Sequence, residues 1–427
     1  MTVTASLTRV MPAGAVAGDG EAEAWSWLGA VPEAVVRPDS TAEVSALLSW
    51  ASAEGMGVVP VGSGRHAPAG RVAAPFVVLS TERMTGMEAY EPADLTFNAR
   101  GGTTVAALDR ALTEHGQWVP LDPPRSSERT LGGLVASGLS GPLWAGYGEI
   151  RNHVLGMTLV RGDGTVLRLG GGVVKNVAGF DLLKPVIGSR GSLGVITTVC
   201  MRTFPIPATD RLLLLRADEI EALVPAARAV CTAPVLPAST VLIAPAGALR
   251  AGAALVVRLH GARETVDADQ ATLEEHAGVS FDHVEARRHA DLLASVQDHG
   301  SDAPVVLRLS VLPSRLGELL EVLTRTRAVA GPGGRTGGRT PLIHADAYAG
   351  QVLVGLGGHG SDGSELAATA ASLRACVESL GGAIGMERLP AGPAADELAA
   401  HPSDEEAELA RGLKRVFDPQ GVLWRSR

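Results

Sequence analysis

The chain alternates short apolar runs with amphipathic segments of helical period, and the first such pair comes early. Ser40 and Glu43 have the spacing of a capping box, which predicts a helix start, and Val44 begins its apolar face. Gly55 would end this helix, and residues 58–61 then read as a buried strand. The same patterns predict strands at residues 76–79, 95–99, 154–160 and 165–169, and a helix at 104–115.

A boundary is predicted at Pro205-Ile206-Pro207, where two prolines interrupt the pattern. Beyond it, strands are predicted at residues 212–215, 240–243, 255–259, 305–311 and 351–356, with helices at 268–277, 361–380 and 405–417. This spacing predicts a sheet covered by helices on one side.

The amino-acid composition excludes several classes of function. A chain of 427 residues that is 46% hydrophobic can bury the cores of two or three domains. The net charge of −9, with acidic and basic residues mixed, argues against a nucleic-acid partner. The cysteines Cys200, Cys231 and Cys376 form no CxxC pair, which argues against a disulfide frame or an iron–sulfur cluster. No secretion signal or membrane-spanning run is recognisable, so we expect a cytoplasmic protein that reaches the inner face of the membrane only through partners.

Glycine is concentrated in two places that follow or precede apolar strand patterns. The loop at residues 62–65 follows a predicted strand, and residues 170–204 hold the densest group. Glycine lets backbone approach a bulky ligand, and backbone amides can cradle phosphate. The alternative to ligand binding is an ordinary strand-to-loop turn at residues 62–65 and a tight connection within residues 170–204. No G-x-G-x-x-G follows the first strand, so a Rossmann fold is not expected.

Five landmarks in a fixed order resemble the FAD domain of the vanillyl-alcohol-oxidase superfamily, and within it the FAD-binding subunits of bacterial glycolate oxidases. They are the loop at residues 60–70, Asp-Pro-Pro at 122–124, Thr-Leu-Gly-Gly at 130–133, Lys-Asn-Val-Ala-Gly-Phe-Asp at 175–181, and the Gly/Ser-rich run at 188–196. The resemblance covers roughly residues 34–205 and implies an α+β fold. A PCMH-type FAD-binding domain of two subdomains would be followed by an α/β cap domain, an antiparallel sheet with helices.

The resemblance also implies domain boundaries and a cofactor site. The implied parts are a flexible segment at 1–30, the FAD-binding domain at 31–207, the cap at 208–400, and a C-terminal helix and tail at 401–427 that return to the FAD domain. The implied FAD-binding residues are Pro60, Val61, Gly62, Ser63, Gly64, Arg65, His66, Gly70, Pro123, Leu131, Gly132, Gly133, Ser137, Gly138, Lys175, Asn176, Gly179, Asp181, Gly188, Ser189, Gly191, Ser192, Gly194, Val195 and Ile196.

The resemblance favours noncovalent FAD, because glycolate oxidase subunits usually carry Lys where this chain has His66. A covalent link through His66 is the alternative, since His66 and Gly70 have the His-x-x-x-Gly spacing of covalent members.

The cap lacks part of a motif that related hydroxy-acid dehydrogenases use to bind metal and substrate. His344 remains, but Gln351 stands where the second histidine of H-A-G-D-G-N-x-H is found, and Arg388 follows Glu387 where E-H-G has histidine. A divalent metal needs several converging ligands, so no metal site is expected and no catalytic residue is assigned. We therefore expect that the chain alone does not oxidise glycolate, with Arg308 or His260 as alternatives that could replace the missing ligands.

The function that the resemblance implies is that of an FAD-dependent oxidoreductase acting on CH–OH groups. The chain would be the FAD-binding subunit of a glycolate-oxidase-type complex, supporting oxidation of glycolate or a similar 2-hydroxy acid to the 2-oxo acid. Its partners would be a homologous catalytic flavoprotein subunit and an iron–sulfur subunit. The alternatives are a stand-alone FAD-dependent oxidase or dehydrogenase of a hydroxy acid, polyol or sugar lactone, and a non-catalytic scaffold stabilised by FAD.

Overall fold

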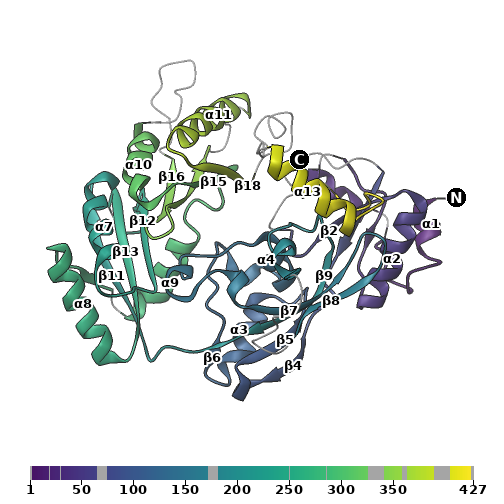
Figure 1. Ribbon diagram of the computed structural model, residues 1–427, viewed down its shortest axis with the longest axis horizontal. Coiled ribbons are helices and arrows are strands. Elements are labelled where there is room, and N and C mark those ends of the chain that lie inside the picture. The colour runs from purple at the N-terminus through teal and green to yellow at the C-terminus, as the bar shows by residue number, and fades with distance from the viewer. Residues whose placement is uncertain are drawn as a thin grey trace.

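The computed structural model describes residues 2–18, 20–28, 30–64, 75–171, 181–249, 251–284, 286–325, 341–357, 363–388 and 404–424. Two lobes lie side by side (Figure 1): the first is built from residues up to β10 (Phe204–Pro205) together with the C-terminal helix, and the second from the residues between. The predicted cofactor residues that lie outside the described part are Arg65, His66, Gly70, Lys175, Asn176 and Gly179.

The first lobe begins with a small parallel sheet in the order β1-β3-β2. Its strands are β1 (Val35–Val36), β2 (Gly57–Val61) and β3 (Phe76–Ser80), and α2 (Thr41–Glu54) connects β1 to β2. The capping box is present: the Ser40 hydroxyl accepts a hydrogen bond from the Glu43 amide at 3.2 Å. The helix ends at Gly55, whose φ of 66° is a left-handed conformation that glycine adopts without strain.

The N-terminal segment, for which a flexible stretch is expected over residues 1–30, contains helical turns and buried side chains. It contains α1 (Val3–Leu7) and the 3-10 helix η1 (Glu21–Leu28). Leu7 and Met11 are buried in the same core cluster as α2. The Ser6 hydroxyl accepts a hydrogen bond from the Trp50 indole at 2.9 Å. Scattered apolar residues without helical periodicity are enough to fix this segment, because a neighbouring face is available to bury them.

The second part of the first lobe is a five-stranded sheet in the order β4-β5-β9-β7-β8, in which every recorded pairing is antiparallel. Its strands are β4 (Met87–Glu91), β5 (Thr96–Arg100), β7 (Val154–Val160), β8 (Val166–Gly170) and β9 (Val195–Arg202). The helices are α3 (Val105–Thr113), α4 (Leu131–Ser137), α5 (Trp144–Tyr147) and α6 (Leu183–Val186), and β6 (Gln117–Trp118) pairs with β10. Leu108 of α3 and Leu134 of α4 pack onto this sheet in one core cluster, so α4 is held at fixed depth beside β9.

The second lobe is an eight-stranded antiparallel sheet in the order β14-β11-β13-β12-β16-β17-β15-β18. Its strands are β11 (Thr209–Ala217), β12 (Ser239–Ala244), β13 (Ala253–Gly261), β14 (Asp282–His283), β15 (Val305–Ser310), β16 (Leu342–Asp346), β17 (Gln351–Leu356) and β18 (Ala383–Arg388). Its helices are α7 (Val224–Thr232), α8 (Arg263–Ala277), α9 (Ala286–Gln297), α10 (Leu316–Arg325) and α11 (Gly363–Ser379).

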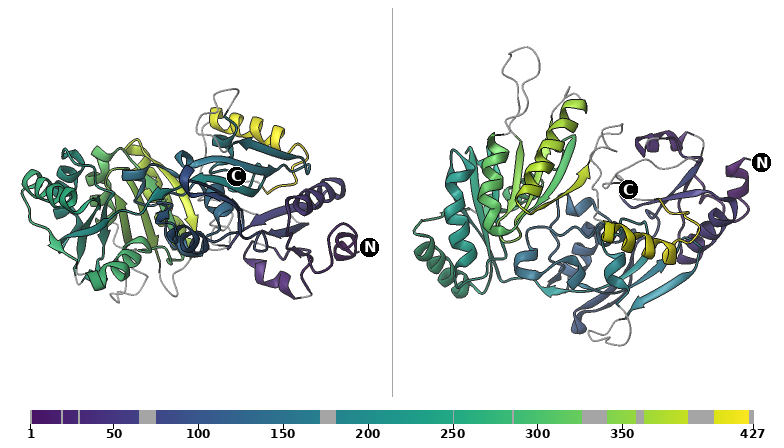
Figure 2. Two further views of the ribbon diagram at one scale, coloured as in Figure 1. Left: turned by 90° about the horizontal axis from the view of Figure 1, so that it is seen from below. Right: turned by 45° about the horizontal axis from the view of Figure 1, so that its top comes forward.

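Both faces of this sheet are covered, which departs from the predicted one-sided arrangement. Helices α7, α8, α10 and α11 pack on one face in the largest core cluster. On the other face Leu292 and Val296 of α9 pack against Leu212, Val241 and other apolar side chains of β11 to β13. These strands carry apolar residues on both faces, as a sheet buried on both sides requires. The second face also turns toward the first lobe (Figure 2).

The C-terminal segment returns to the first lobe. Helix α13 (Asp404–Phe417) lies along that lobe in Figure 1, and its Phe417 joins the core cluster of the five-stranded sheet. Beyond it the chain runs beside β2: the Val58 amide donates to Val422 O at 2.8 Å, and the Trp424 amide donates to Val58 O at 3.1 Å. Among the described helices, none combines the length and apolar character needed to cross a bilayer.

Candidate functional site

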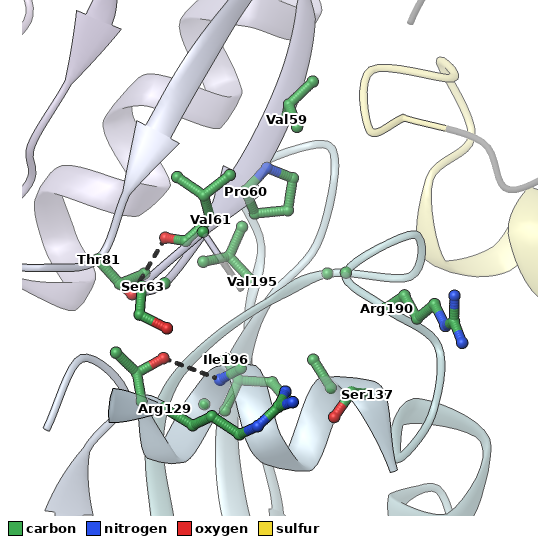
Figure 3. Close-up of a pocket in the computed structure, with 18 of the residues that line it drawn as sticks. Val59, Pro60, Val61, Ser63, Thr81, Arg129, Ser137, Arg190, Val195 and Ile196 are labelled. Carbon is green, nitrogen blue, oxygen red and sulfur yellow. Dashed lines mark hydrogen bonds between the residues drawn. The ribbon is translucent and has the colours of Figure 1, made fainter. Parts of the chain in front are cut away.

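A cavity of about 840 Å³, part of it open to solvent, lies where the end of β2, the start of α4 and the loop before β9 meet. The predicted cofactor-binding residues that line it are Pro60, Val61, Gly62, Ser63, Gly64, Gly132, Gly133, Ser137, Gly191, Gly194, Val195 and Ile196. Figure 3 shows the β2 residues on one side of the opening, with Arg129 and Ser137 on the other. Segments that are far apart in the sequence therefore line a single cavity.

The first wall depends on a contact between Gly62 and Thr130. A Cβ atom on Gly62 would lie 2.1 Å from the Thr130 hydroxyl oxygen, so no larger residue fits without a shift. That hydroxyl also caps α4 by accepting a hydrogen bond from the Gly133 amide at 3.3 Å. The close approach brings the loop after β2 directly onto the beginning of α4.

The same loop presents polar backbone to the cavity. Within the described part of the chain, no protein acceptor is recorded for the amides of Gly62, Ser63 and Gly64. Two arginines, Arg129 and Arg190, are also part of the lining, and of these the Arg190 guanidinium is bonded to Met386 O of the second lobe. Backbone amides and guanidinium groups together are the donors that a pyrophosphate accepts from. The residues present therefore fit a phosphate-bearing cofactor.

The opposite wall comes from the loop that precedes β9. Gly191 has a φ of +81°, and a Cβ there would lie 2.7 Å from Pro60 Cγ of β2. Gly194 also lines the cavity, but a Cβ on it would point at the core residue Leu159, 2.7 Å from its Cδ1. The small residue at position 194 thus serves the packing of the sheet beneath the cavity.

The remaining described residues of the predicted set do not line the cavity; they are Pro123, Leu131, Gly138, Asp181, Gly188, Ser189 and Ser192. Leu131 belongs to the core cluster of the sheet. Gly138 packs behind the cavity, because a Cβ on it would lie 3.0 Å from the Cα of Gly188. The Ser192 hydroxyl donates to Ser189 O at 2.7 Å and closes the turn before β9. These residues shape the loop from outside the cavity.

Arg190 and Trp424 line the cavity but were not among the predicted residues. Arg190 adopts a left-handed φ of 53°, and its amide donates to Ala136 O at 2.7 Å. Its carbonyl accepts a hydrogen bond from the Trp424 indole at 2.9 Å. Its guanidinium donates to Met386 O of β18 at 3.0 Å, which links the loop to the second lobe. Val59, Thr81, Thr130 and Ala136 complete the unpredicted part of the lining, together with Arg129.

A second cavity of about 470 Å³, again partly open to solvent, lies between the two lobes. The first lobe supplies Pro124, Arg125, Arg129 and Leu139, and the second supplies Ser301, Val306, Leu353, Glu387 and Arg388. Arg129 lines both cavities, so they adjoin at this side chain. Arg129 Nε donates to Pro124 O at 2.7 Å, which fixes the guanidinium between them.

The remnants of the metal-binding motif are far apart. His344 lies on β16 and Glu387 on β18, with β17 and β15 between them, which corresponds to about 14 Å across the sheet. Burial lowers the pKa of His344 to about 4, with His299 adding to the effect, so its imidazole is neutral. In the part of the chain that the structure describes, no group of three or more His, Cys, Asp or Glu side chains could hold a metal ion.

The two residues considered as replacements have other partners. His260 Nδ1 lies 2.8 Å from the Tyr147 hydroxyl of α5, and Arg308 Nε lies 3.1 Å from a Glu387 carboxylate oxygen. Next to His260, Arg258 forms two hydrogen bonds to Asp210, at 2.8 and 2.6 Å. Despite burial, these bonds hold the pKa of the Asp210 carboxyl well below its usual range. Neither His260 nor Arg308 lines either cavity.

Two buried carboxyl groups stand at the contact between the lobes. Asp122 of the Asp-Pro-Pro landmark accepts a hydrogen bond from the Leu143 amide at 2.9 Å, and Asp346 accepts one from the Trp144 indole at 3.0 Å. Burial raises the pKa of Asp122 to about 6 and that of Asp346 to about 7. Asp122 fixes the residue that precedes α5, and Asp346 joins α5 to the second lobe, so Asp122 has a structural role.

Residues 32–170 match the family model described as "FAD binding domain". This part of the chain is therefore similar to FAD-binding domains. The glycolate oxidase subunit GlcE of Escherichia coli (strain K12) is 44% identical over 123 residues, which cover 29% of this chain and 35% of that protein. The glycolate oxidase subunit GlcD of Bacillus subtilis (strain 168) is 29% identical over 257 residues, 57% of this chain and 55% of that protein.

A D-lactate dehydrogenase of Archaeoglobus fulgidus is 36% identical over 172 residues, 40% of this chain and 38% of that protein. These matches span about a third to just over half of each relative's length. The structure of p-cresol methylhydroxylase with substrate bound has a TM-score of 0.72 at 16% identity, over 92% of this chain and 88% of that one. The predicted fold class, a PCMH-type FAD domain followed by an antiparallel-sheet cap, is confirmed. The predicted class of FAD-dependent oxidoreductase agrees with the names of these relatives.

Proposed function

We propose that this chain is an FAD-dependent oxidoreductase acting on CH–OH groups, and specifically the FAD-binding subunit of a glycolate-oxidase-type complex. The complex would oxidise glycolate or a similar 2-hydroxy acid to the 2-oxo acid. The observation that carries the proposal is the pair of adjoining cavities: one has glycine and backbone amides in its walls, and the other lies between the lobes. Arg129 belongs to both.

The residues of the first cavity would hold FAD noncovalently. The amides of Gly62, Ser63 and Gly64 and the guanidinium of Arg129 would bind the pyrophosphate, because charge-assisted hydrogen bonds of this kind contribute about 1.5–3 kcal/mol each. When bound, FAD supplies the acceptor for the two electrons that leave the substrate carbon. Trp424 is held in this wall by its hydrogen bond to the Arg190 carbonyl.

The second lobe would act as the cap over the adjoining cavity. Its side chains there are Ser301, Glu387 and Arg388, with apolar Val306 and Leu353. Glu387 is engaged by Arg190 at 3.4 Å and Arg308 at 3.1 Å, so it is a poor candidate for a free base. This arrangement favours a subunit that acts with a partner over a complete enzyme.

The proposed partners are a homologous catalytic flavoprotein and an iron–sulfur subunit. The support is the similarity to proteins named as glycolate oxidase subunits, GlcE and GlcD. The proposed location is the cytoplasm, with any membrane contact at its inner face made through those partners.

Anaerobic mixing tests the proposal. The purified flavin-loaded chain is mixed with glycolate, D-lactate and a panel of polyols, alone and after co-purification with the products of neighbouring genes. We expect the visible flavin band of the isolated chain to persist and that of the complex to bleach with a 2-hydroxy acid. Bleaching of the isolated chain would instead establish a stand-alone dehydrogenase. If the complex is fully loaded with FAD and its flavin band persists with every hydroxy acid, the scaffold role is the remaining alternative for this chain.

A further inference from the structure

We propose that the cavity between the lobes binds the carboxylate of a small hydroxy acid directly through Arg388, with no metal ion. The inference rests on the proposed function for the adjoining FAD site and names the ligand chemistry of the second cavity. Its basis is the charge, the partners and the size of that cavity.

The lining of the cavity is strongly cationic. Arg125, Arg129 and Arg388 face a single acidic lining residue, Glu387. The negative charge of Glu387 is already shared by Arg308 and by Arg190, neither of which lines this cavity. An anion entering the cavity would therefore meet a surplus of guanidinium groups.

Arg388 is the residue best placed to bind that anion. Arg125 is held by two acidic partners, Glu128 at 3.0 Å and Asp302 at 2.7 Å. For Arg388 the described residues show no ion pair, although the side chain is partly buried at the end of β18. A partly buried guanidinium without a carboxylate partner is stabilised when a ligand carboxylate supplies one, and its planar fork matches a carboxylate in two hydrogen bonds.

The remaining lining residues favour a small ligand that also carries a hydroxyl group. The buried Ser301 hydroxyl lines the cavity and has no hydrogen-bond partner among the described residues. Leu139, Val306 and Leu353 form apolar walls within a volume of about 470 Å³ that includes space open to solvent. A 2-hydroxy acid would satisfy both polar groups, with its carboxylate at Arg388 and its hydroxyl toward Ser301.

The test is a calorimetric titration of the full-length protein with glycolate in buffer containing EDTA, run on protein with and without FAD. We expect glycolate to bind in EDTA, and Arg388→Gln to weaken binding at least tenfold. Arg388→Lys keeps the positive charge but loses the planar guanidinium, so its affinity for glycolate should lie between those of the wild type and Arg388→Gln. Arg325→Gln is the matched control, because Arg325 is 78% exposed on α10 and pairs only with Glu321 among the described residues. Thermal unfolding of each variant verifies that it is folded.

The outcomes separate this inference from the proposed function. Unchanged glycolate binding in folded Arg388→Gln would overturn the inference, as would binding that requires added divalent metal. Displacement of glycolate by an equal concentration of inorganic phosphate would overturn the assignment to a carboxylate. Protein that loads FAD but binds no glycolate contradicts only this inference, whereas protein that cannot load FAD contradicts the proposed function.

Discussion

The Trp424 indole donates a hydrogen bond of 2.9 Å to the carbonyl of Arg190, which lies 234 residues earlier in the chain. The bond joins the C-terminal tail to the loop before β9, and both residues line the larger cavity. The same Arg190 reaches Met386 of β18 with its guanidinium. One residue therefore connects the tail, the first lobe and the second lobe.

Trp424→Phe should weaken FAD binding while leaving the chain folded. The substitution keeps most of the apolar contact but removes one hydrogen bond, which contributes about 0.5–1.5 kcal/mol and corresponds to about twofold to tenfold in affinity. Equilibrium dialysis of the apoprotein with FAD measures the change. Trp144→Phe is the control, since its indole bonds to Asp346 at the lobe contact instead. An equal loss of FAD affinity in both variants would argue against a specific role for Trp424.

Asp418→Asn should release the tail. The buried Asp418 carboxylate accepts hydrogen bonds from the amides of Val422 at 2.8 Å and Leu423 at 2.9 Å, and Lys414 Nζ lies 2.7 Å from it. Replacing the charged acceptor should lower the free energy of unfolding by about 2–4 kcal/mol and reduce FAD retention. Denaturant unfolding measures the loss of stability. Asp282→Asn is the control, because the exposed ion pair of Asp282 contributes about 0–1 kcal/mol. Full retention of FAD in Asp418→Asn would mean that the tail does not support the cavity.

The free energy of unfolding should decrease as the pH falls, because the buried His153 becomes protonated less readily in the folded protein than in the unfolded chain. This histidine is fully buried, its Nε2 donates to Gly148 O at 3.1 Å, and Arg202 Nε donates to its Nδ1 at 3.2 Å. Burial and then the charge of Arg202 lower its pKa to about 4. The unfolded chain binds this proton more readily, so the stabilising contribution is complete above about pH 6.5 and is lost as the pH falls toward 4.

Replacement of His153 isolates this effect from other titrating groups. Buried Asp122 and Asp346 have raised pKa values and act with the opposite sign over part of the same range. We expect the difference in unfolding free energy between wild type and His153→Gln to shrink by about 2 kcal/mol between pH 7 and pH 5. Chemical unfolding at both pH values measures it. A difference that does not change with pH would show that His153 titrates normally.

Local chemistry explains which parts of the fold could be predicted from the sequence. Helix α2 lies where Ser40 and Gly55 predict its ends, because capping and a left-handed terminus are decided by neighbouring residues. The glycines of the cavity walls could be found for a different reason, because a close approach excludes a side chain however distant the partner is in the sequence. Position 62 tolerates no side chain beside Thr130, and such a constraint leaves a glycine in the sequence.

The parts that could not be predicted depend on distant contacts. Nothing in the sequence near Trp424 indicates that it faces the loop at Arg190, since only the return of the tail beside β2 brings them together. Helix α9 was missed because its apolar Leu292 and Val296 are few and its face is defined by the sheet it covers. Arg129 could not be predicted as a site residue either, because only the folded structure places it between the two cavities.

Acid precipitation should release the flavin from the protein. The prediction of noncovalent FAD concerns His66, which lies outside the described residues, so it stays a prediction. Yellow colour in the supernatant after precipitation is the expected result. Colour that remains in the wild-type pellet and disappears in His66→Ala would establish a covalent link.

Titration of the apoprotein with FAD shows whether the cavity between β2, α4 and the loop before β9 holds the cofactor. Gly62→Ala should weaken binding at least about tenfold, because its methyl group would meet Thr130 in the wall. Ser63→Glu, at an exposed position that leaves the fold intact, should weaken it similarly by repelling the pyrophosphate. Gly171→Ala, where a Cβ has no neighbour within 4 Å, should bind as wild type. Wild-type affinity in folded Gly62→Ala and Ser63→Glu alike would show that FAD does not bind in this cavity.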